Sequence, residues 1–437
     1  MYKIYVVIIW YVCIYLFLCL ININFSYTMY IYFSIIYIYM YMSYIMVWFL
    51  FFMYIIMLYI LYLNTKKIIS FFKYKYVLYT YIVILYIITF IIIIEDFLFF
   101  IVLFECLFFP ICFVSLFYNF NNRFIFSIYY LLLFSSLSSI LCIMIIMFII
   151  FHFNIFNIYI FLDICFFDSI YIIIYIWFTL YTIFGIKYPI WPLHIWLPEL
   201  HVEVNTEMSV VLASIVLKIG FFGLFKFIFI LFNYVSIWFL GFVDIIIIVG
   251  ILLISFQILL LCDYKKIIAY WSVVHTCISL ILIWHNDLLF IGILYMCNLS
   301  HVISSGLMFI MIGYIYDNYG FRIFLLLISF FGISIWNNLF VCLFLFNIDF
   351  PFMLLFYVDI FILYGFLNIS YIYIYCMFII SMIMFASTLY IYVCLTYYSF
   401  IWLDKYLRLD LTINDIYIYV NIIIYTLLLF YIIYILF

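Results

Sequence analysis

The chain is 437 residues long; 75% of its residues are hydrophobic, only 7% are charged, and the formal net charge is -3. A soluble protein of this length needs many charged side chains to cover its surface, so the composition excludes a soluble globular enzyme. Because helices satisfy their own backbone hydrogen bonds in lipid, we expect an all-α polytopic membrane protein. No basic tract extends beyond residues 66–75, so we expect no nucleic-acid partner.

Polar residues divide the chain into about 13 or 14 apolar segments of roughly 20 residues, the length that crosses a bilayer as a helix. No cleavage site of small residues follows residues 4–21, so we expect them to form a retained first span. Lysine and arginine fall mainly on one side of this map, which we assign to the matrix or cytoplasm. The expected spans run near residues 4–21, 28–62 (one long or two short), 76–94, 97–118, 124–151, 159–186, 206–231, 236–261, 267–284, 288–315, 323–346, 350–366, 371–403 and 415–437.

Two of these segments are expected to be broken helices. Pro189, Pro192 and Pro198 follow Lys187 closely, and proline removes a backbone donor and disfavours helix at the residue before it. Pro351 introduces a second interruption in the other half of the chain. A broken segment in each half is typical of inverted-repeat transporters, in which freed backbone lines a polar cavity.

This pattern predicts four parts. Residues 1–95 form N-terminal transmembrane helices, residues 96–235 a first transporter-like repeat, residues 236–403 a second, and residues 404–437 a C-terminal transmembrane helix. No soluble domain is visible, so we expect other chains to supply any part outside the membrane.

Five ionisable side chains are expected at depth in the bilayer. At about 1.5 Å per helical residue, Glu105, Lys218 and Asp359 fall near the middle of a hydrocarbon core about 30 Å thick. His275 and His301 lie roughly 13 and 21 Å into their own spans. Each inserted charge costs about 2.5–3.5 kcal/mol, which favours a functional role in proton transfer. The alternative is that these groups form buried ion pairs that only hold helices together.

We also have expectations for two other charged residues and for two glycines that follow Lys218. Lys226 and Asp244 lie near span ends, where we expect their charged groups to reach the interface. Gly220 and Gly223 follow Lys218 within two turns, and we expect them to leave space for water beside its ammonium.

Several motifs together resemble one known family. The longest is KYPIWPLHIWLPELHVE, from Lys187 onward, followed by LASIVLKIGFFGLFKF around Lys218. The chain is similar in these motifs to the antiporter-like subunits of proton-pumping NADH:ubiquinone oxidoreductase, respiratory complex I. The resemblance extends from about Asp96 to Asp359, and its further motifs are FFIVLFECLFFP, DYKKIIAYWSVVHT, LSHVISSGLMF and IYDNYGFR.

The resemblance implies a proton relay. Glu105 and Lys187 would form the interacting pair of one half-channel, and Lys218 would pass the proton centrally. His275 and His301 would continue the relay to Asp359. At that last position the family's chains 2 and 5 carry lysine, so the acid separates this chain from them. Asn205, Glu207 and Met208 depart from the family pattern.

The remaining expectations concern cofactors, partners and location. The 12 cysteines form no C-x-x-C pair, and no glycine-rich phosphate loop occurs, so we expect no cofactor and no metal in this chain. The chain would be a subunit of an H+-translocating NADH:ubiquinone reductase whose redox steps take place in other subunits. Its partners would be lipids and other membrane-arm subunits, including the chain 5 and chain 2 homologues. The abundance of Phe, Tyr and Ile, which have AT-rich codons, favours an organelle-encoded protein of the mitochondrial inner membrane.

Three alternatives remain at this point. The chain could be the chain 5 or chain 2 homologue of the same complex. It could belong to a multi-subunit cation/proton antiporter, which shares the lysines and broken helices and is distinguished by sodium transport without NADH-linked activity. It could also be a purely architectural membrane subunit.

Overall fold

The computed structural model describes residues 71–94, 96–118, 122–153, 170–229, 232–284, 288–319, 354–367 and 371–397. Within these ranges every regular element is a helix, which confirms the predicted all-α fold. The elements are α3 Phe71–Ile93, α4 Phe97–Cys106, α5 Phe108–Tyr118, α6 Asn122–Phe153, α8 Ile170–Lys187, α9 Trp196–Glu203, α10 Thr206–Val211, η1 Leu212–Val216, α11 Leu217–Gly223, η2 Leu224–Phe229, α12 Asn233–Leu259, α13 Tyr264–Trp284, α14 Leu288–Tyr319, α17 Leu354–Leu367 and α18 Tyr371–Tyr397. The expected spans 4–21, 28–62, 323–346 and 415–437 lie outside the described residues, as does the second break at Pro351.

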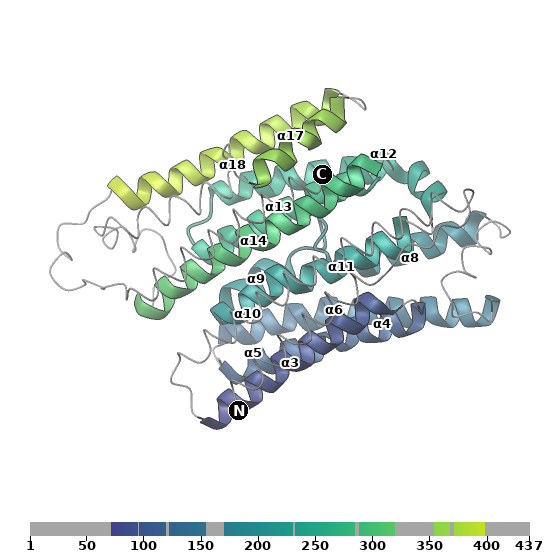
Figure 1. Ribbon diagram of the computed structural model, residues 1–437, viewed down its shortest axis with the longest axis horizontal. Helices are drawn as coiled ribbons and strands as arrows, with labels where there is room; N and C mark the ends of the chain where they lie inside the picture. Colours follow the sequence, from purple (N-terminus) through teal and green to yellow (C-terminus); the bar gives the residue numbers. More distant parts are fainter. Residues whose placement is uncertain are drawn as a thin grey trace, which may run out of the picture.

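The long helices lie side by side in one bundle (Figure 1). Helices α3 to α6 form one flank, α17 and α18 form the other, and α9 to α14 lie between them. Helix α13 packs against α12, α14 and α9, while α6 packs against α8 and α9. The central helices are therefore covered from both flanks. The four-part division of the chain stays a prediction.

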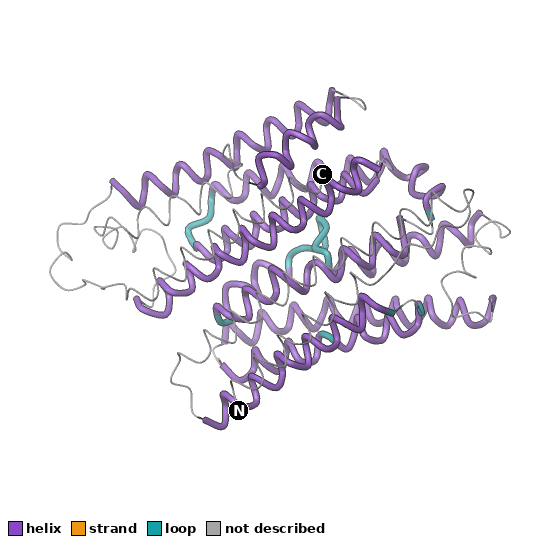
Figure 2. Tube along the Cα trace, viewed as in Figure 1, coloured by secondary structure: helices purple, strands orange, loops and turns teal. Residues whose placement is uncertain are grey.

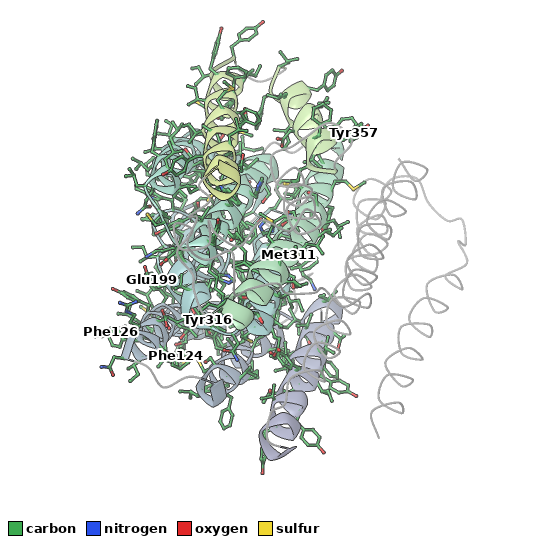
Figure 3. All side chains as sticks on the ribbon, turned by 90° about the vertical axis from the view of Figure 1, so that its left-hand side faces the viewer. Phe124, Phe126, Glu199, Met311, Tyr316 and Tyr357 are labelled. Atoms are coloured by element: carbon green, nitrogen blue, oxygen red, sulfur yellow. The ribbon has the colours of Figure 1, made fainter. Side chains whose placement is uncertain are left out.

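Six helical stretches in the described part of the chain are long and apolar enough to cross a membrane: Phe97–Leu116, Asn122–Phe151, Thr206–Phe229, Gly241–Leu259, Ile293–Gly313 and Tyr371–Ile391. The flanking helices keep apolar side chains on their outer faces. On α6, Phe124 points inward and is 1% exposed, whereas Phe126, at the outer edge in Figure 3, is 67% exposed. In water such faces would be unstable, and lipid or a partner chain must cover them.

The predicted break at Lys187 is confirmed. Helix α8 ends at this residue, a turn region follows, and α9 begins at Trp196. This turn lies in the middle of the bundle (Figure 2). Backbone groups freed by the break find new partners: Ile190 N donates to Gly185 O at 3.0 Å, and the Trp196 indole donates to Ile186 O at 2.8 Å. A helix can be broken at membrane depth only when the freed backbone groups find hydrogen-bond partners in this way.

The stretch that carries Lys218 is the most enclosed helix of the described residues. Every residue of its apolar stretch, Thr206–Phe229, is buried except Lys226, which is half-buried. Two π-helical segments, η1 and η2, flank the single short α-helical segment α11 that holds Lys218. Widened turns of this kind often occur at functional sites, because they change the direction in which side chains leave the helix.

The expectation for the two glycines on α11 was wrong. A Cβ atom at Gly220 would lie 2.6 Å from the backbone nitrogen of Tyr188, and one at Gly223 would lie 2.3 Å from the ring of Phe184. These glycines do not open a space for water. They allow α11 to pack directly on the end of α8, because a side chain at either position would collide with it.

Candidate functional site

The first charged group of the site is an ion pair between α4 and α8. Lys187 Nζ lies 3.1 Å from Glu105 Oε1, and the two side chains are 3% and 20% exposed, respectively. Ser138, on α6, places its hydroxyl 3.1 Å from the same carboxylate oxygen, and the thiol of Cys142 lies 3.7 Å from it. The pair that the resemblance implied is thus formed, and α6 supplies two polar neighbours that the sequence reasoning missed.

The ammonium of Lys187 has further partners on α4 and α5. It donates a hydrogen bond to the carbonyl of Phe104 at 2.6 Å. It also lies 3.7 Å from the centre of the Phe104 ring and 4.6 Å from that of Phe108, within the range of cation–π attraction. Because Lys187 occupies the last turn of α8, the negative end of the helix dipole adds to this stabilisation. These contacts offset part of the cost of burying the ammonium.

The second charged group lies deeper in the bundle. Lys218 Nζ is hydrogen-bonded to His301 Nδ1, and this bond joins α11 to α14. The ring centre of His275, on α13, lies 5.8 Å from that of His301. Both imidazoles and the lysine are buried. Three of the residues predicted from the sequence thus form one contiguous cluster.

The last residue of the expected relay, Asp359, lies on α17 and is half-buried. Helix α17 packs against α14, which carries His301, and against α18. The connection from His301 to Asp359 stays a prediction.

A residue that the sequence reasoning missed lies between the two groups. Tyr188 directly follows Lys187, and its buried hydroxyl is hydrogen-bonded to Ser279 Oγ on α13 and to Asn298 Oδ1 on α14, the latter at 3.1 Å. Ser279 is one turn beyond His275, and Asn298 is one turn before His301. A tyrosine at the helix break was the available signal, but its hydroxyl partners could not be named from the sequence.

The expectation for Asp244 is wrong, because its side chain is buried in the bundle, whereas the expectation for Lys226, which is half-buried, stays a prediction. Asp244 is 1% exposed, and its Oδ2 accepts a hydrogen bond from the Tyr373 hydroxyl of α18 at 2.6 Å. Lys226 donates to the backbone carbonyl of Ile94. A neighbouring helix thus supplies the polar partner that burial of Asp244 requires.

Further charged residues lie at the ends of α9, α10 and α13. Lys266 forms an ion pair with Glu199, and Lys265 donates to the carbonyl of Val204 at 3.1 Å. Glu207, a departure from the family pattern, is buried in the first turn of α10, where the positive end of the helix dipole favours an acid. In the part of the chain that the structure describes, no three His, Cys, Asp or Glu side chains converge as a metal site requires.

Comparison with known proteins agrees with this architecture. The family described as "NADH:quinone oxidoreductase/Mrp antiporter, TM" matches residues 95–427. A curated relative from Chondrus crispus, "NADH-ubiquinone oxidoreductase chain 4", is 39% identical over 150 residues, which make up 34% of this chain and 30% of that protein. The aligned stretch therefore spans less than a third of this relative's length.

Two solved structures share the fold. In the respiratory complex I of Thermus thermophilus with bound NADH, the similar chain has a TM-score of 0.71 and 17% identity, with 87% of this chain and 80% of that chain covered. In the Mrp complex of Dietzia sp. DQ12-45-1b, the values are 0.64 and 14%, with 72% and 59% covered. The family match extends over well more than half of the sequence, and the chain therefore belongs to the NADH:quinone oxidoreductase/Mrp antiporter transmembrane family.

Proposed function

We propose that this chain is the chain 4 subunit in the membrane arm of a mitochondrial respiratory complex I and that it translocates protons. The observation that carries the proposal is the pair of buried lysines, each in contact with a titratable partner. Lys187 contacts Glu105, and Lys218 contacts His301. Isolated charges are costly inside a membrane, and groups held in this way can exchange a proton with their neighbours.

The ion pair would act as the input of the relay. While Glu105 lies next to Lys187, each charge stabilises the other. If a movement in the complex separates them, the buried ammonium loses its counter-charge and favours release of its proton. Ser138 and the backbone carbonyl of Phe104 would hold the two partners during this exchange.

The central cluster would receive that proton. Neutral imidazole can accept a proton on one nitrogen and donate from the other, so His301 and His275 can pass it onward from Lys218. Asp359, on α17, which packs against α14, would be the exit acid. Energy for these steps would come from NADH oxidation in other subunits, since no cofactor is expected in this chain.

Replacement of Lys218 tests the proposal in the assembled complex. We expect Lys218→Ala to lower proton uptake into membrane vesicles more than it lowers NADH oxidation. Lys226→Ala is the matched control, because Lys226 is a lysine two turns further along the same continuous helix, where it donates a hydrogen bond to the backbone carbonyl of Ile94. Unchanged proton uptake per NADH oxidised in an assembled Lys218→Ala complex would support the architectural role instead.

The cation/proton antiporter alternative keeps support from the shared fold with the Mrp complex. The two functions separate on the driving reaction. In a complex I subunit, proton uptake follows addition of NADH and does not require sodium. Sodium/proton exchange under an imposed pH gradient, without any NADH-dependent activity in the purified assembly, would favour the antiporter.

A further inference from the structure

Tyr188 contacts the four helices that carry the lysines and histidines of the two sites. Its backbone nitrogen donates to Phe184 O of α8 at 2.8 Å, and the same nitrogen lies against Gly220 of α11. Its ring packs near Phe221, with 6.0 Å between the ring centres. Its hydroxyl reaches α13 and α14. One fully buried side chain thus joins α8, α11, α13 and α14.

The hydroxyl of Tyr188 has more acceptors than protons. It can donate its single proton to Asn298 Oδ1 or to Ser279 Oγ. Ser279 can in turn donate to Tyr188 or to the carbonyl of Thr276, which lies 2.7 Å away. Since each hydroxyl has one proton and two acceptors, the two choices are linked: when Tyr188 donates to Asn298, Ser279 is free to donate to Tyr188. The tyrosine therefore bonds α13 and α14 at the same time.

From this arrangement we propose that Tyr188 is a positioning residue that couples the Glu105–Lys187 pair to the Lys218–His301–His275 cluster. The inference rests on the proposed proton translocation and adds to it the residue that joins the two sites. A shift of the broken segment at Lys187 moves Tyr188 with it, because the two residues are adjacent in the chain. The hydroxyl transmits that shift to α13 and α14, and the Gly220 contact transmits it to α11.

The titratable groups near Tyr188 define the readout. Cys277 on α13 and Cys297 on α14 interact with Tyr188, and Lys187 precedes it in the chain. The helices that it contacts also carry Lys218, His275 and His301. If Tyr188 sets their relative placement, loss of its hydroxyl changes how protons distribute among them. Proton uptake measured across a range of pH detects this change, whereas a residue that only stabilises the fold would change the amount of assembled complex.

The test compares Tyr188→Phe with Tyr295→Phe in the assembled complex. Tyr295 is an equally buried tyrosine on α14 whose ring also packs against Phe221, and its hydroxyl has no hydrogen-bond partner within the described residues. For Tyr188→Phe we expect proton uptake per NADH oxidised to fall by about two- to tenfold, as for a step that loses one hydrogen bond. We also expect the pH profile of uptake to move by about half a unit or more. Tyr295→Phe should change neither.

Two further variants separate the outcomes. Ser279→Ala removes one hydroxyl partner but leaves the Tyr188 ring in place, and it gives the same readout if Tyr188→Phe fails to assemble. The double variant of both residues should be no worse than the more severe single one. If Lys218→Ala lowers uptake but Tyr188→Phe and Ser279→Ala both behave like Tyr295→Phe, the inference is wrong and proton translocation stands. If Lys218→Ala itself leaves uptake unchanged, the proposed function fails first.

Discussion

The backbone of Gly220 lies against the backbone nitrogen of Tyr188, so close that a Cβ atom would come within 2.6 Å of it. This contact brings the helix of Lys218 to the residue that follows Lys187. The two lysines lie on different helices, and no side chain separates the backbones that carry them. The distance between the two sites therefore depends on a glycine.

We expect Gly220→Ala to disturb this contact. The atoms that a methyl group would meet include main-chain atoms of Tyr188 and Lys187, which cannot move aside as a flexible side chain can. Overpacking of this kind costs about 1–3 kcal/mol, against a gain of up to about 1 kcal/mol in helix propensity. The measurement is the amount and thermal stability of the assembled complex. Gly241→Ala, on α12 with nothing within 4 Å of the added atom, is the control and should be neutral or slightly stabilising.

We expect Glu105→Gln to impair proton uptake and to weaken the packing of α4 on α8. The change leaves the Lys187 ammonium without its counter-charge, and breaking a buried ion pair costs up to about 3–5 kcal/mol. The carbonyl of Phe104 remains as an acceptor, so the loss should fall below that range. Thermal stability of Glu105→Gln, Lys187→Met and the double variant measures the coupling. Strictly additive losses in this cycle would mean that the two groups do not act as a pair.

Ser138→Ala should have a smaller effect on the same pair. It removes the hydroxyl next to Glu105 Oε1. That hydroxyl also lies 2.8 Å from the carbonyl of Ser135, so it shares its one proton, and the loss should fall below the about 1.5–3 kcal/mol of a full hydrogen bond to a charged group. We expect lower proton uptake per NADH oxidised with little change in assembly. Ser139→Ala is the matched control, because Ser139 donates to the Ser136 carbonyl of its own helix. Equal effects of the two changes would argue against a role of Ser138 at the ion pair.

Tyr373→Phe should loosen the contact between α12 and α18. Asp244 is buried and accepts a hydrogen bond from the Tyr373 hydroxyl, so loss of this donor costs about 1–3 kcal/mol. The measurement is the temperature at which the complex dissociates in detergent. Tyr375→Phe, on the same helix with Tyr375 70% exposed, should leave that temperature unchanged. A normal dissociation temperature for Tyr373→Phe would show that Asp244 is held by other groups.

Several features followed from the sequence because they depend on local chemistry. The apolar composition predicted membrane helices, since backbone groups in lipid must bond within their own segment. Proline predicted the end of α8 at Lys187, because it removes a backbone donor at a known position. The motifs around Glu105, Lys187 and Lys218 identified the family, and residues 95–427 confirm it.

The partners of these residues were decided by the tertiary structure. Asp244 was expected at the interface and is instead bonded to Tyr373, 129 residues later in the chain. Gly220 was expected beside water and instead contacts Tyr188. Helical periodicity gives the face on which a residue lies relative to its own helix, but the rotation and approach of a second helix depend on every side chain between them. In a chain that is apolar on nearly all faces, that rotation leaves little trace in the sequence, so only the packed bundle determines which polar groups meet.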